Sequence, residues 1–335
     1  MATVLLTSSF DVQTEQSRWW NDEFRLRRSA AGCAKHQLVD EPAQADVILL
    51  VAGGESDQRT SRTHRYAQDF PEKCFVFDTG DRVIPFLRGV YASVEKRYWN
   101  PKRVKPGFYA KVFDHDSIQP SLAATREKFL FSFVGSFANA PVRRQLAKLS
   151  HPRGHIVDTS QAPANLPNQD ADTYRAFSED YARVISNSSF VLCPRGVGTA
   201  SYRIFEAMKA ARVPVIISDQ WVPPEELDWE SFSLRTRERD VLSIFSRLEE
   251  LEPHAAALGA RARAAWEQYY AEQTAFQTIV DSCLKLKGET TWARERISRC
   301  LVRCQMLRPW YLRHLVAPGA ARRLRLGRYK REQTL

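Results

Sequence analysis

The sequence lacks the cysteine spacings of a disulfide framework or a metal site. None of its six cysteines forms a CxxC pair, and none stands at zinc-site spacing from a histidine. They are Cys33, Cys74, Cys193, Cys283, Cys300 and Cys304. Long apolar runs are also missing, because no stretch approaches the roughly twenty uncharged residues of a membrane span. The opening MATVLLTSSF does not have the charged head and long apolar run of a signal peptide. We therefore expect reduced thiols and a cytoplasmic protein.

Net charge is absent from most of the chain. Residues 291–335 hold twelve basic and two acidic residues, which accounts for the whole net charge of +10, and the remainder holds 37 of each sign. A neutral body without a basic groove argues against nucleic acid as a partner, because phosphate backbones bind basic surfaces. The length of 335 residues and the hydrophobic content of 44% predict two packed domains.

Short apolar runs alternate with amphipathic helical stretches along the first 290 residues. This alternation predicts an α/β fold of two consecutive units, each a parallel sheet covered by helices on both faces. Strands are expected at 2–9, 45–53, 74–81, 129–136, 155–160, 190–196 and 213–219, and helices at 141–149, 171–188 and 199–211. We predict domains at residues 1–120 and 121–290, followed by a basic segment at 291–335.

Charged residues and glycines stand where a predicted strand leads into a predicted helix, in residues 193–219. The sequence of this stretch is CPRGVGTASYRIFEAMKAARVPVIISD. A glycine turn at a helix N-terminus lets backbone amides approach an anion, and Arg195 adds a cation that can contact phosphate oxygens. Within the helix, Glu206 lies on the same face as Arg203 and can accept hydrogen bonds from the vicinal hydroxyls of a ribose. An ordinary surface ion pair between these two residues remains the alternative.

A dinucleotide site is a second alternative for the same stretch. GVGTAS follows a strand, and Asp219 ends the next strand about twenty residues on, as in a dinucleotide fingerprint. Ser201 stands where the third glycine belongs, and two arginines would crowd a pyrophosphate that is usually held by backbone alone. An NAD(P)-dependent oxidoreductase is therefore the less favoured interpretation.

The order of motifs here resembles the exostosin domain of glycosyltransferase family 47. Residues 189–234 carry the succession F-x-L-x-P-x-G, R-x-x-E-A, P-V-I-I and D-W-x-x-F, and FSFVGSFANAPVRRQL upstream resembles the F-x-G loop of that family. The resemblance covers about residues 129–250. It implies a GT-B fold, in which two Rossmann-like domains face a central cleft and the second domain binds the donor nucleotide.

The resemblance also implies a reaction and residue roles. The reaction would be inverting transfer from a nucleotide diphosphate sugar, most often a UDP-sugar, with no further cofactor. Arg195 and Arg203 would neutralise the leaving diphosphate, and Glu206 would hold the ribose. The other candidates of the donor site are Gly135, Ser136, Arg143, Gly196, Ser201 and Asp219.

Inversion needs a general base for the acceptor hydroxyl, and the motifs do not identify it. Asp78 and Asp81 follow a first-domain strand and are our candidates, while His64 and Asp219 remain alternatives. In the loop after Asp219, Trp221 is a candidate for stacking on a sugar, and Asp228 and Trp229 are expected to anchor the loop.

Two short acidic motifs, DHD at 114–116 and DAD at 170–172, imitate the metal-binding D-x-D of other glycosyltransferases. Capping and solvation explain both motifs more simply, and arginines can replace the cation in a GT-B protein. We predict no metal.

The basic segment 291–335 combines arginines with Trp310 and Tyr311, as in helices that lie on anionic membranes. The alternative is a helix that packs back on the N-terminal domain. Expected partners are a nucleotide sugar, a glycan or lipid-linked glycan acceptor, and the inner face of a membrane. A catalytically inactive, glycan-binding relative of the transferases remains the non-enzymatic alternative.

Overall fold

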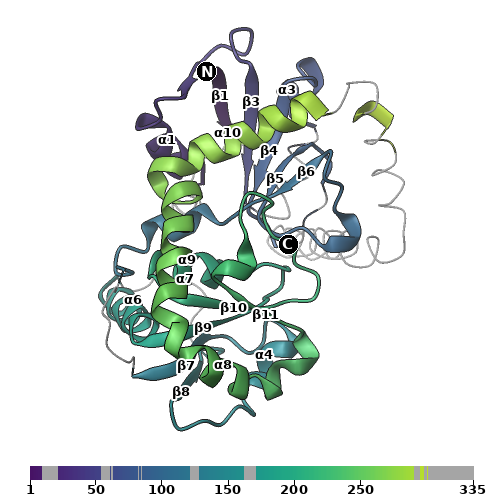
Figure 1. The fold of residues 1–335 in the computed structure, drawn as a ribbon. Coiled ribbons are helices and arrows are strands. Elements are labelled where there is room, and N and C mark those ends of the chain that lie inside the picture. Colours follow the sequence, from purple (N-terminus) through teal and green to yellow (C-terminus); the bar gives the residue numbers. More distant parts are fainter. Residues whose placement is uncertain are drawn as a thin grey trace, which may run out of the picture.

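The computed structural model describes residues 1–9, 22–53, 61, 63–81, 83, 85–120, 128–161, 171–289, 295–297 and 300 of the chain (Figure 1). The described residues form two α/β units, one above the other in the view of Figure 1, with helix α9 along the second unit and helix α10 along the first.

The first unit is built on a six-stranded sheet in which every pairing is parallel. The strand order is β2-β1-β3-β4-β5-β6. Its strands are β1 (Ala2–Ser8), β2 (His36–Leu38), β3 (Val47–Ala52), β4 (Cys74–Asp78), β5 (Gly89–Tyr91) and β6 (Val104–Pro106). Strands β3 and β4 are buried along their whole length, which explains their near-continuous apolar sequences.

Helices cover both faces of this sheet. Helix α1 (Asp22–Ala31) lies beside α10 (Glu272–Glu289), and side chains of β1, β3 and β4 on that face join their core. Alternate residues of the same strands point to the other face and pack against Ala67 of helix α3 (Arg65–Asp69).

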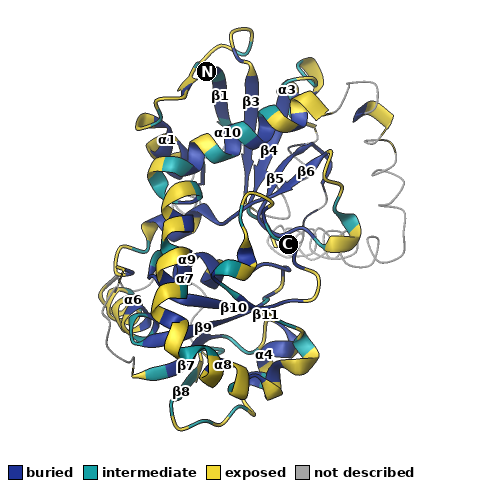
Figure 2. Ribbon diagram, in the orientation of Figure 1, coloured by how far each residue is buried: buried dark blue, intermediate teal, exposed yellow. Residues whose placement is uncertain are grey.

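The second unit has a five-stranded parallel sheet in the order β11-β10-β9-β7-β8. Its strands are β7 (Phe129–Gly135), β8 (Gly154–Asp158), β9 (Ser188–Pro194), β10 (Val213–Ile217) and β11 (Leu234–Thr236). One face packs against α6 (Ala171–Ser186), α7 (Tyr202–Lys209) and α9 (Ala255–Tyr269), and the other against α4 (Pro141–Leu146) and α8 (Phe245–Leu251). Figure 2 shows β7, β9 and β10 buried between these helices.

The predicted fold class is confirmed: the protein has two Rossmann-like α/β units of the GT-B type. In each sheet the first strand lies between the second and the third, so the strand order reverses between β1 and β3 and again between β7 and β9. Ligands of such sheets bind outside the carboxyl ends of the strands at this switch point. The fold therefore directs attention to the loops that follow β7 and β9.

Helix α10 returns to the first unit. It lies within the range 121–290 that we predicted as the second domain, yet it packs on α1 and on strands β3, β5 and β6 of the first sheet. Alanine, phenylalanine, isoleucine and valine at its buried positions complete the core of that unit. The two units are therefore connected twice, because the chain leaves the first unit after β6 and returns to it with helix α10.

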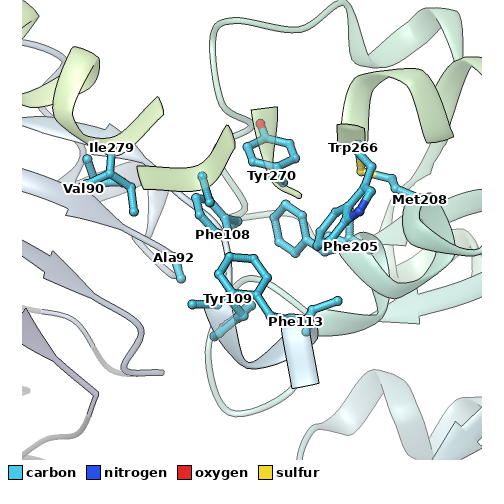
Figure 3. Close-up of a cluster of buried hydrophobic side chains, with 14 of the residues drawn as sticks. Val90, Ala92, Phe108, Tyr109, Phe113, Phe205, Met208, Trp266, Tyr270 and Ile279 are labelled. Carbon is cyan, nitrogen blue, oxygen red and sulfur yellow. The ribbon is translucent and has the colours of Figure 1, made fainter. Parts of the chain in front are cut away.

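An aromatic cluster joins the two units (Figure 3). Phe108 follows β6. The centre of its ring lies 6.2 Å from that of Phe205 in α7 and 5.1 Å from that of Tyr270. Tyr109 meets Phe205 edge to face at 6.4 Å. All four rings are buried, so the hydrophobic core continues from one unit into the other and holds them in one orientation.

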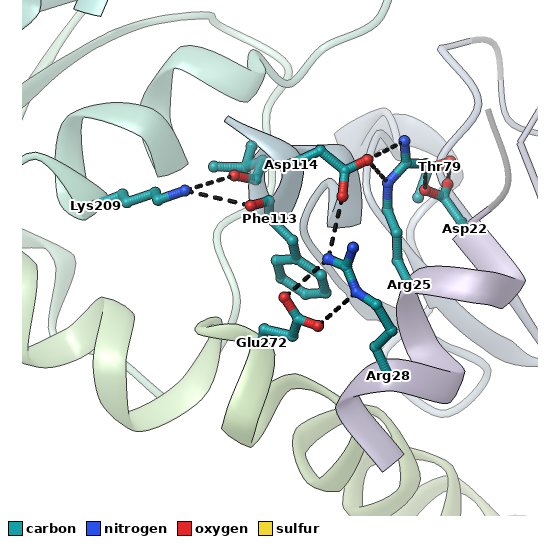
Figure 4. Close-up of polar contacts among 9 residues, drawn as sticks. Asp22, Arg25, Arg28, Thr79, Phe113, Asp114, Lys209 and Glu272 are labelled. Atoms are coloured by element: carbon teal, nitrogen blue, oxygen red, sulfur yellow. Dashed lines mark hydrogen bonds and ion pairs between the residues drawn. The ribbon is translucent and has the colours of Figure 1, made fainter. Parts of the chain in front are cut away.

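Polar contacts add to this junction through the short 3-10 helix Ala110–Asp114 (Figure 4). Asp114 of the DHD motif forms ion pairs with Arg25 and Arg28 of α1, at 2.6 and 3.1 Å. From the second unit, the ammonium group of Lys209 donates to the carbonyl of Val112 at 3.1 Å. Asp114 therefore fixes the 3-10 helix to α1 through ion pairs, whereas we expected capping or solvation for this motif.

Candidate functional site

The sequence-predicted donor residues converge at the switch point of the second sheet. Gly135 ends β7, and the segment from Arg195 to Ser201 links β9 to α7. Because β7 and β9 are neighbours in the sheet, both loops open at the same edge. The structure thus brings together two motifs that lie sixty residues apart in the sequence.

Arg203 is buried at the centre of this site. Its side chain is 3% exposed, and its Nε and Nη2 donate to the carbonyl of Val134 at 3.1 and 2.6 Å. The remaining guanidinium nitrogen, Nη1, is buried without a hydrogen-bond partner. A Cβ atom on Gly135 would lie 2.1 Å from Nη2, so this position has to be glycine for the guanidinium to fit.

Arg143 of α4 approaches from the other side. Its guanidinium donates to three backbone carbonyls, those of Arg195 at 2.9 Å and of Ser136 and Pro194 at 3.3 Å. It therefore fastens the loop after β7 to the loop after β9. Burial, together with the charge of nearby Arg203, lowers the pKa of Arg143 to about 10, which still leaves it charged at neutral pH.

Arg195 already has a carboxylate partner in this structure. Its Nε donates to Glu238 Oε1 at 2.7 Å. The same carboxylate faces the backbone N–H of Asp219 at 3.4 Å, and the Asp219 carboxylate accepts from the N–H of Glu238 at 3.1 Å. Asp219 thus stabilises the loop after β10, and a diphosphate would compete with Glu238 for Arg195. Their roles toward a donor stay predictions.

The two candidate serines and Gly196 lie in the same place. The Ser136 hydroxyl is 3.2 Å from that of Ser160, in the loop after β8. Ser201 is the N-cap residue of α7, but its hydroxyl makes no capping bond and is buried without a partner. A Cβ on Gly196 would lie 3.1 Å from Nη2 of Arg143, so this glycine also leaves room for a guanidinium.

Glu206 is buried one turn further along α7. It is 3% exposed, and the hydroxyl of Tyr181 in α6 donates to its carboxylate. Burial, followed by the charge of Glu206, raises the pKa of Tyr181 well above its ordinary value, so the phenol stays protonated and donates. Since Arg203 and Glu206 are both buried, the alternative of an ordinary surface ion pair is wrong.

The two aspartates proposed as base differ in their surroundings. Asp78 is 1% exposed, and its Oδ1 accepts from the N–H of Gly80 at 2.7 Å. Asp81 is exposed and lies against the glycine turn of the second unit, where a Cβ on Gly198 would be 2.9 Å from its Oδ1. The hydroxyl of Tyr109 is 3.4 Å from the same oxygen. Asp81 is therefore the candidate that the fold brings to the donor site.

His64 caps helix α3 in the first unit, where its Nδ1 accepts from the N–H of Tyr66.

Trp221 is buried, 2% exposed, and packs edge to face against Trp229, with 5.0 Å between the ring centres. The hypothesis that Trp221 stacks on a sugar is therefore wrong. Trp229 does anchor the loop, because its indole N–H donates to the carbonyl of Pro224 at 2.9 Å.

A serine of the first unit, which the sequence did not single out, occupies part of the predicted anion site. The Ser93 hydroxyl accepts from the N–H of Thr199 at 2.8 Å and of Ala200 at 3.4 Å. These amides belong to the glycine turn that we expected to bind phosphate. In this structure they hold the two units together, so the available positive charge comes from the arginine side chains.

Within the described residues, no group of three histidine, cysteine, aspartate or glutamate side chains is arranged to hold a metal. Asp170 of the DAD motif lies outside the described residues, and Asp172 stands in the first turn of α6.

Most of the basic segment 291–335 also lies outside the described residues. Its described part includes Glu295, which is buried and forms an ion pair with Arg103 of the first unit at 2.9 Å. Among the helices that the structure describes, none combines the length and the apolar character needed to cross a bilayer.

Comparison with known proteins identifies the domain. The family model of the Exostosin GT47 domain matches residues 90–251, which extends the resemblance upstream to include Ser93 and Tyr109. An Exostosin-1 homolog of Caenorhabditis elegans is 41% identical over 204 residues, covering 54% of this chain and 51% of the relative. Exostosin-1 of Drosophila melanogaster is 26% identical over 180 residues, covering 49% of this chain and 23% of the relative.

The chain thus spans about half the length of the worm relative and less of the fly protein. Among solved structures, Anabaena HepE in complex with UDP is similar with a TM-score of 0.39 and 12% identity, covering 85% of this chain and all of that one. The sequence matches, not this distant structural likeness, carry the assignment. Residues 90–251 are therefore similar to an exostosin domain of the glycosyltransferase family 47 type.

Proposed function

We propose that the chain is an inverting glycosyltransferase that moves a sugar from a UDP-sugar to a glycan or lipid-linked glycan acceptor. The observation that carries the proposal is Arg203, a buried guanidinium at the β7/β9 switch point whose Nη1 has no hydrogen-bond partner. A buried cationic donor without an acceptor is costly unless a ligand completes it. The diphosphate of a nucleotide sugar supplies such an acceptor.

The arginines also suit the chemistry of the donor. When the bond between sugar and phosphate breaks, the electron pair leaves with the diphosphate, and negative charge grows on its oxygens. Arg203 and Arg143 are fixed by backbone carbonyls before the reaction, so they stabilise this charge without first having to reorganise. With cations of this kind in place, we propose transfer without a metal and without a cofactor other than the donor.

Glu206 is proposed to hold the ribose. A carboxylate has acceptor positions for several donors, so the bond from Tyr181 leaves room for a ribose hydroxyl. The buried setting strengthens such hydrogen bonds.

Asp81 is proposed as the general base. In inverting transfer the acceptor oxygen attacks the anomeric carbon from the side opposite the leaving diphosphate, and its proton passes to a base. Asp81 comes from the first unit and lies against the donor turn at Gly198, where an acceptor on the first unit would meet the donor. Its carboxylate takes the hydroxyl proton as the new glycosidic bond forms.

The first test is nucleotide binding. Thermal-shift screening of the full chain with UDP, GDP, CMP and NAD is expected to show stabilisation by UDP. A response to NAD alone would refute the transferase proposal and favour the dinucleotide alternative.

The second test is transfer. Release of UDP from a panel of UDP-sugars, with glycan oligosaccharides as acceptors, is expected to require Asp81 and to continue in EDTA. Asp81→Asn is expected to keep UDP affinity and lose transfer. Tight UDP binding by the wild type with neither transfer nor hydrolysis would instead indicate an inactive, glycan-binding protein.

We further propose that the chain works at the cytoplasmic face of a membrane through the basic segment. A truncation after residue 300 keeps Glu295 and its ion pair with Arg103. It is expected to lose binding to vesicles that contain anionic lipid and to keep UDP affinity. Unchanged vesicle binding would refute this part of the proposal.

A further inference from the structure

An exposed aromatic residue lies at the mouth of the donor site without a role in the proposed chemistry. Tyr202 is the first residue of α7 and is 43% exposed, in contrast to the buried residues that follow it along the helix. Val197, in the glycine turn just before the helix, is 42% exposed. Two large side chains, one within the turn and one at the start of the helix, are thus open to solvent, whereas the other members of the turn are mostly buried.

Contacts of Arg203 place the Tyr202 ring at the switch point. The Arg203 guanidinium carbon lies 4.9 Å from the centre of that ring. The same guanidinium bonds to the carbonyl of Val134 and lies against Gly135, at the carboxyl end of β7. The ring therefore lies against the guanidinium whose Nη1 is buried without a partner.

We propose that Tyr202 is the platform on which the nucleobase of the bound nucleoside diphosphate stacks. This inference rests on the proposed function, since it assumes that the diphosphate lies on Arg203. A nucleotide bound there extends its base toward the protein surface near the helix start, where Tyr202 offers an apolar face. Stacking of a base on an aromatic ring is favourable for every base because each has a π-face.

The other positions first considered for the base fit less well. Pro194 is the last residue of β9 and is buried, with its carbonyl occupied by Arg143. In the loop after β8, Asp158 is used by the backbone, because its Oδ1 accepts from the N–H groups of Phe137 and Ser160. Tyr202 combines exposure, an aromatic ring and contact with the arginine that binds the phosphate.

The experiment separates the base from the diphosphate by comparing two ligands. Isothermal titration calorimetry of the full chain measures the affinities of UDP and of inorganic pyrophosphate for the wild type, Tyr202→Ala and Tyr202→Phe. Since Tyr202 is exposed, neither variant removes core packing. Phe177→Ala is the matched control, because this residue of α6 is a similarly exposed aromatic, 38% accessible.

The expected result is that Tyr202→Ala weakens UDP about tenfold and leaves pyrophosphate within about twofold of the wild type. Tyr202→Phe and Phe177→Ala are expected to keep both affinities. UDP therefore loses its advantage over pyrophosphate only where the aromatic ring is lost.

Three results would overturn the inference and leave the proposed anion site standing. The first is an equal loss of affinity for both ligands in Tyr202→Ala, which would mean that the ring only supports Arg203. The second is a Tyr202→Ala variant that keeps both affinities. The third is a wild type that binds pyrophosphate as tightly as UDP. A wild type that binds neither ligand would overturn the proposed function itself, and the inference with it.

Discussion

Replacing Gly135 by alanine tests whether the donor site is built around the Arg203 guanidinium. The new Cβ would lie 2.1 Å from Nη2 and 2.9 Å from Cζ of Arg203, so the guanidinium has to move. Movement breaks its two hydrogen bonds to the carbonyl of Val134. A hydrogen bond to a charged group contributes about 1.5–3 kcal/mol, and overpacking a core typically costs about 1–3 kcal/mol. We expect Gly135→Ala to lower the free energy of unfolding by about 3 kcal/mol.

Urea unfolding followed by circular dichroism measures this change, and a double-mutant cycle isolates its cause. In an Arg203→Ala background the obstructing guanidinium is gone, so Gly135→Ala is expected to cost under about 1 kcal/mol. Gly288→Ala is the control, because a Cβ there meets nothing within 4 Å. An equal cost of Gly135→Ala in both backgrounds would refute the reasoning, since the conflict would then lie with the ring of Phe133, 3.1 Å away.

Three further changes test the remaining groups. Glu206→Gln and Tyr181→Phe are each expected to weaken UDP about tenfold and to reduce its advantage over 2′-deoxy-UDP, as measured by calorimetry; an unchanged ratio contradicts the ribose role. Arg143→Gln is expected to bind UDP more weakly than the wild type at pH 8, with a smaller gap at pH 10.5. The lowered pKa of about 10 means that Arg143 loses most, not all, of its charge in this interval, and a constant gap would count against a charge effect. Ser93→Ala leaves the N–H of Thr199 without its acceptor, and we expect a loss of about 1–3 kcal/mol in urea unfolding, which Ser160→Ala should not reproduce.

The strands that sequence reasoning located are the longer ones, of five to seven residues, and most of them are buried. Val47–Ala52 and Cys74–Asp78 read as apolar runs because both faces of a parallel sheet are covered. Three-residue strands such as His36–Leu38 and Gly89–Tyr91 were missed, since three residues are too few to show a period. They form because the neighbouring strand offers paired backbone groups, which is information from the tertiary structure.

The site was predictable where one motif carried it and not where two distant segments meet. The arginines and glycines after β7 and β9 stand out in the sequence. Ser93 and Tyr181 do not, because each acts through a contact with a residue 106 or 25 positions away. For the same reason the sequence led us to expect that the amides of the glycine turn bind phosphate. Only the fold shows that these amides donate to the Ser93 hydroxyl.

The glycines of the site distinguish the two kinds of nucleotide site that the sequence alone left open. In a dinucleotide fingerprint the glycines let the backbone approach a pyrophosphate. None of the glycines that the structure describes has a positive φ, so their backbone conformation does not demand glycine. Two of them instead make room for charged side chains, Gly135 for Arg203 and Gly196 for Arg143, while Gly198 makes room for the Ser93 hydroxyl and for Asp81.

This difference changes what the site can recognise. Backbone amides bind an anion without adding net charge, whereas Arg203 and Arg143 bring two buried positive charges that a diphosphate offsets. Such a pair stabilises a diphosphate more as it leaves, because its charge grows, than while it is still esterified to the sugar. A hydride-transfer enzyme keeps its pyrophosphate intact and gains nothing from that preference. The steric role of the glycines therefore favours a site for a departing diphosphate over one for a dinucleotide.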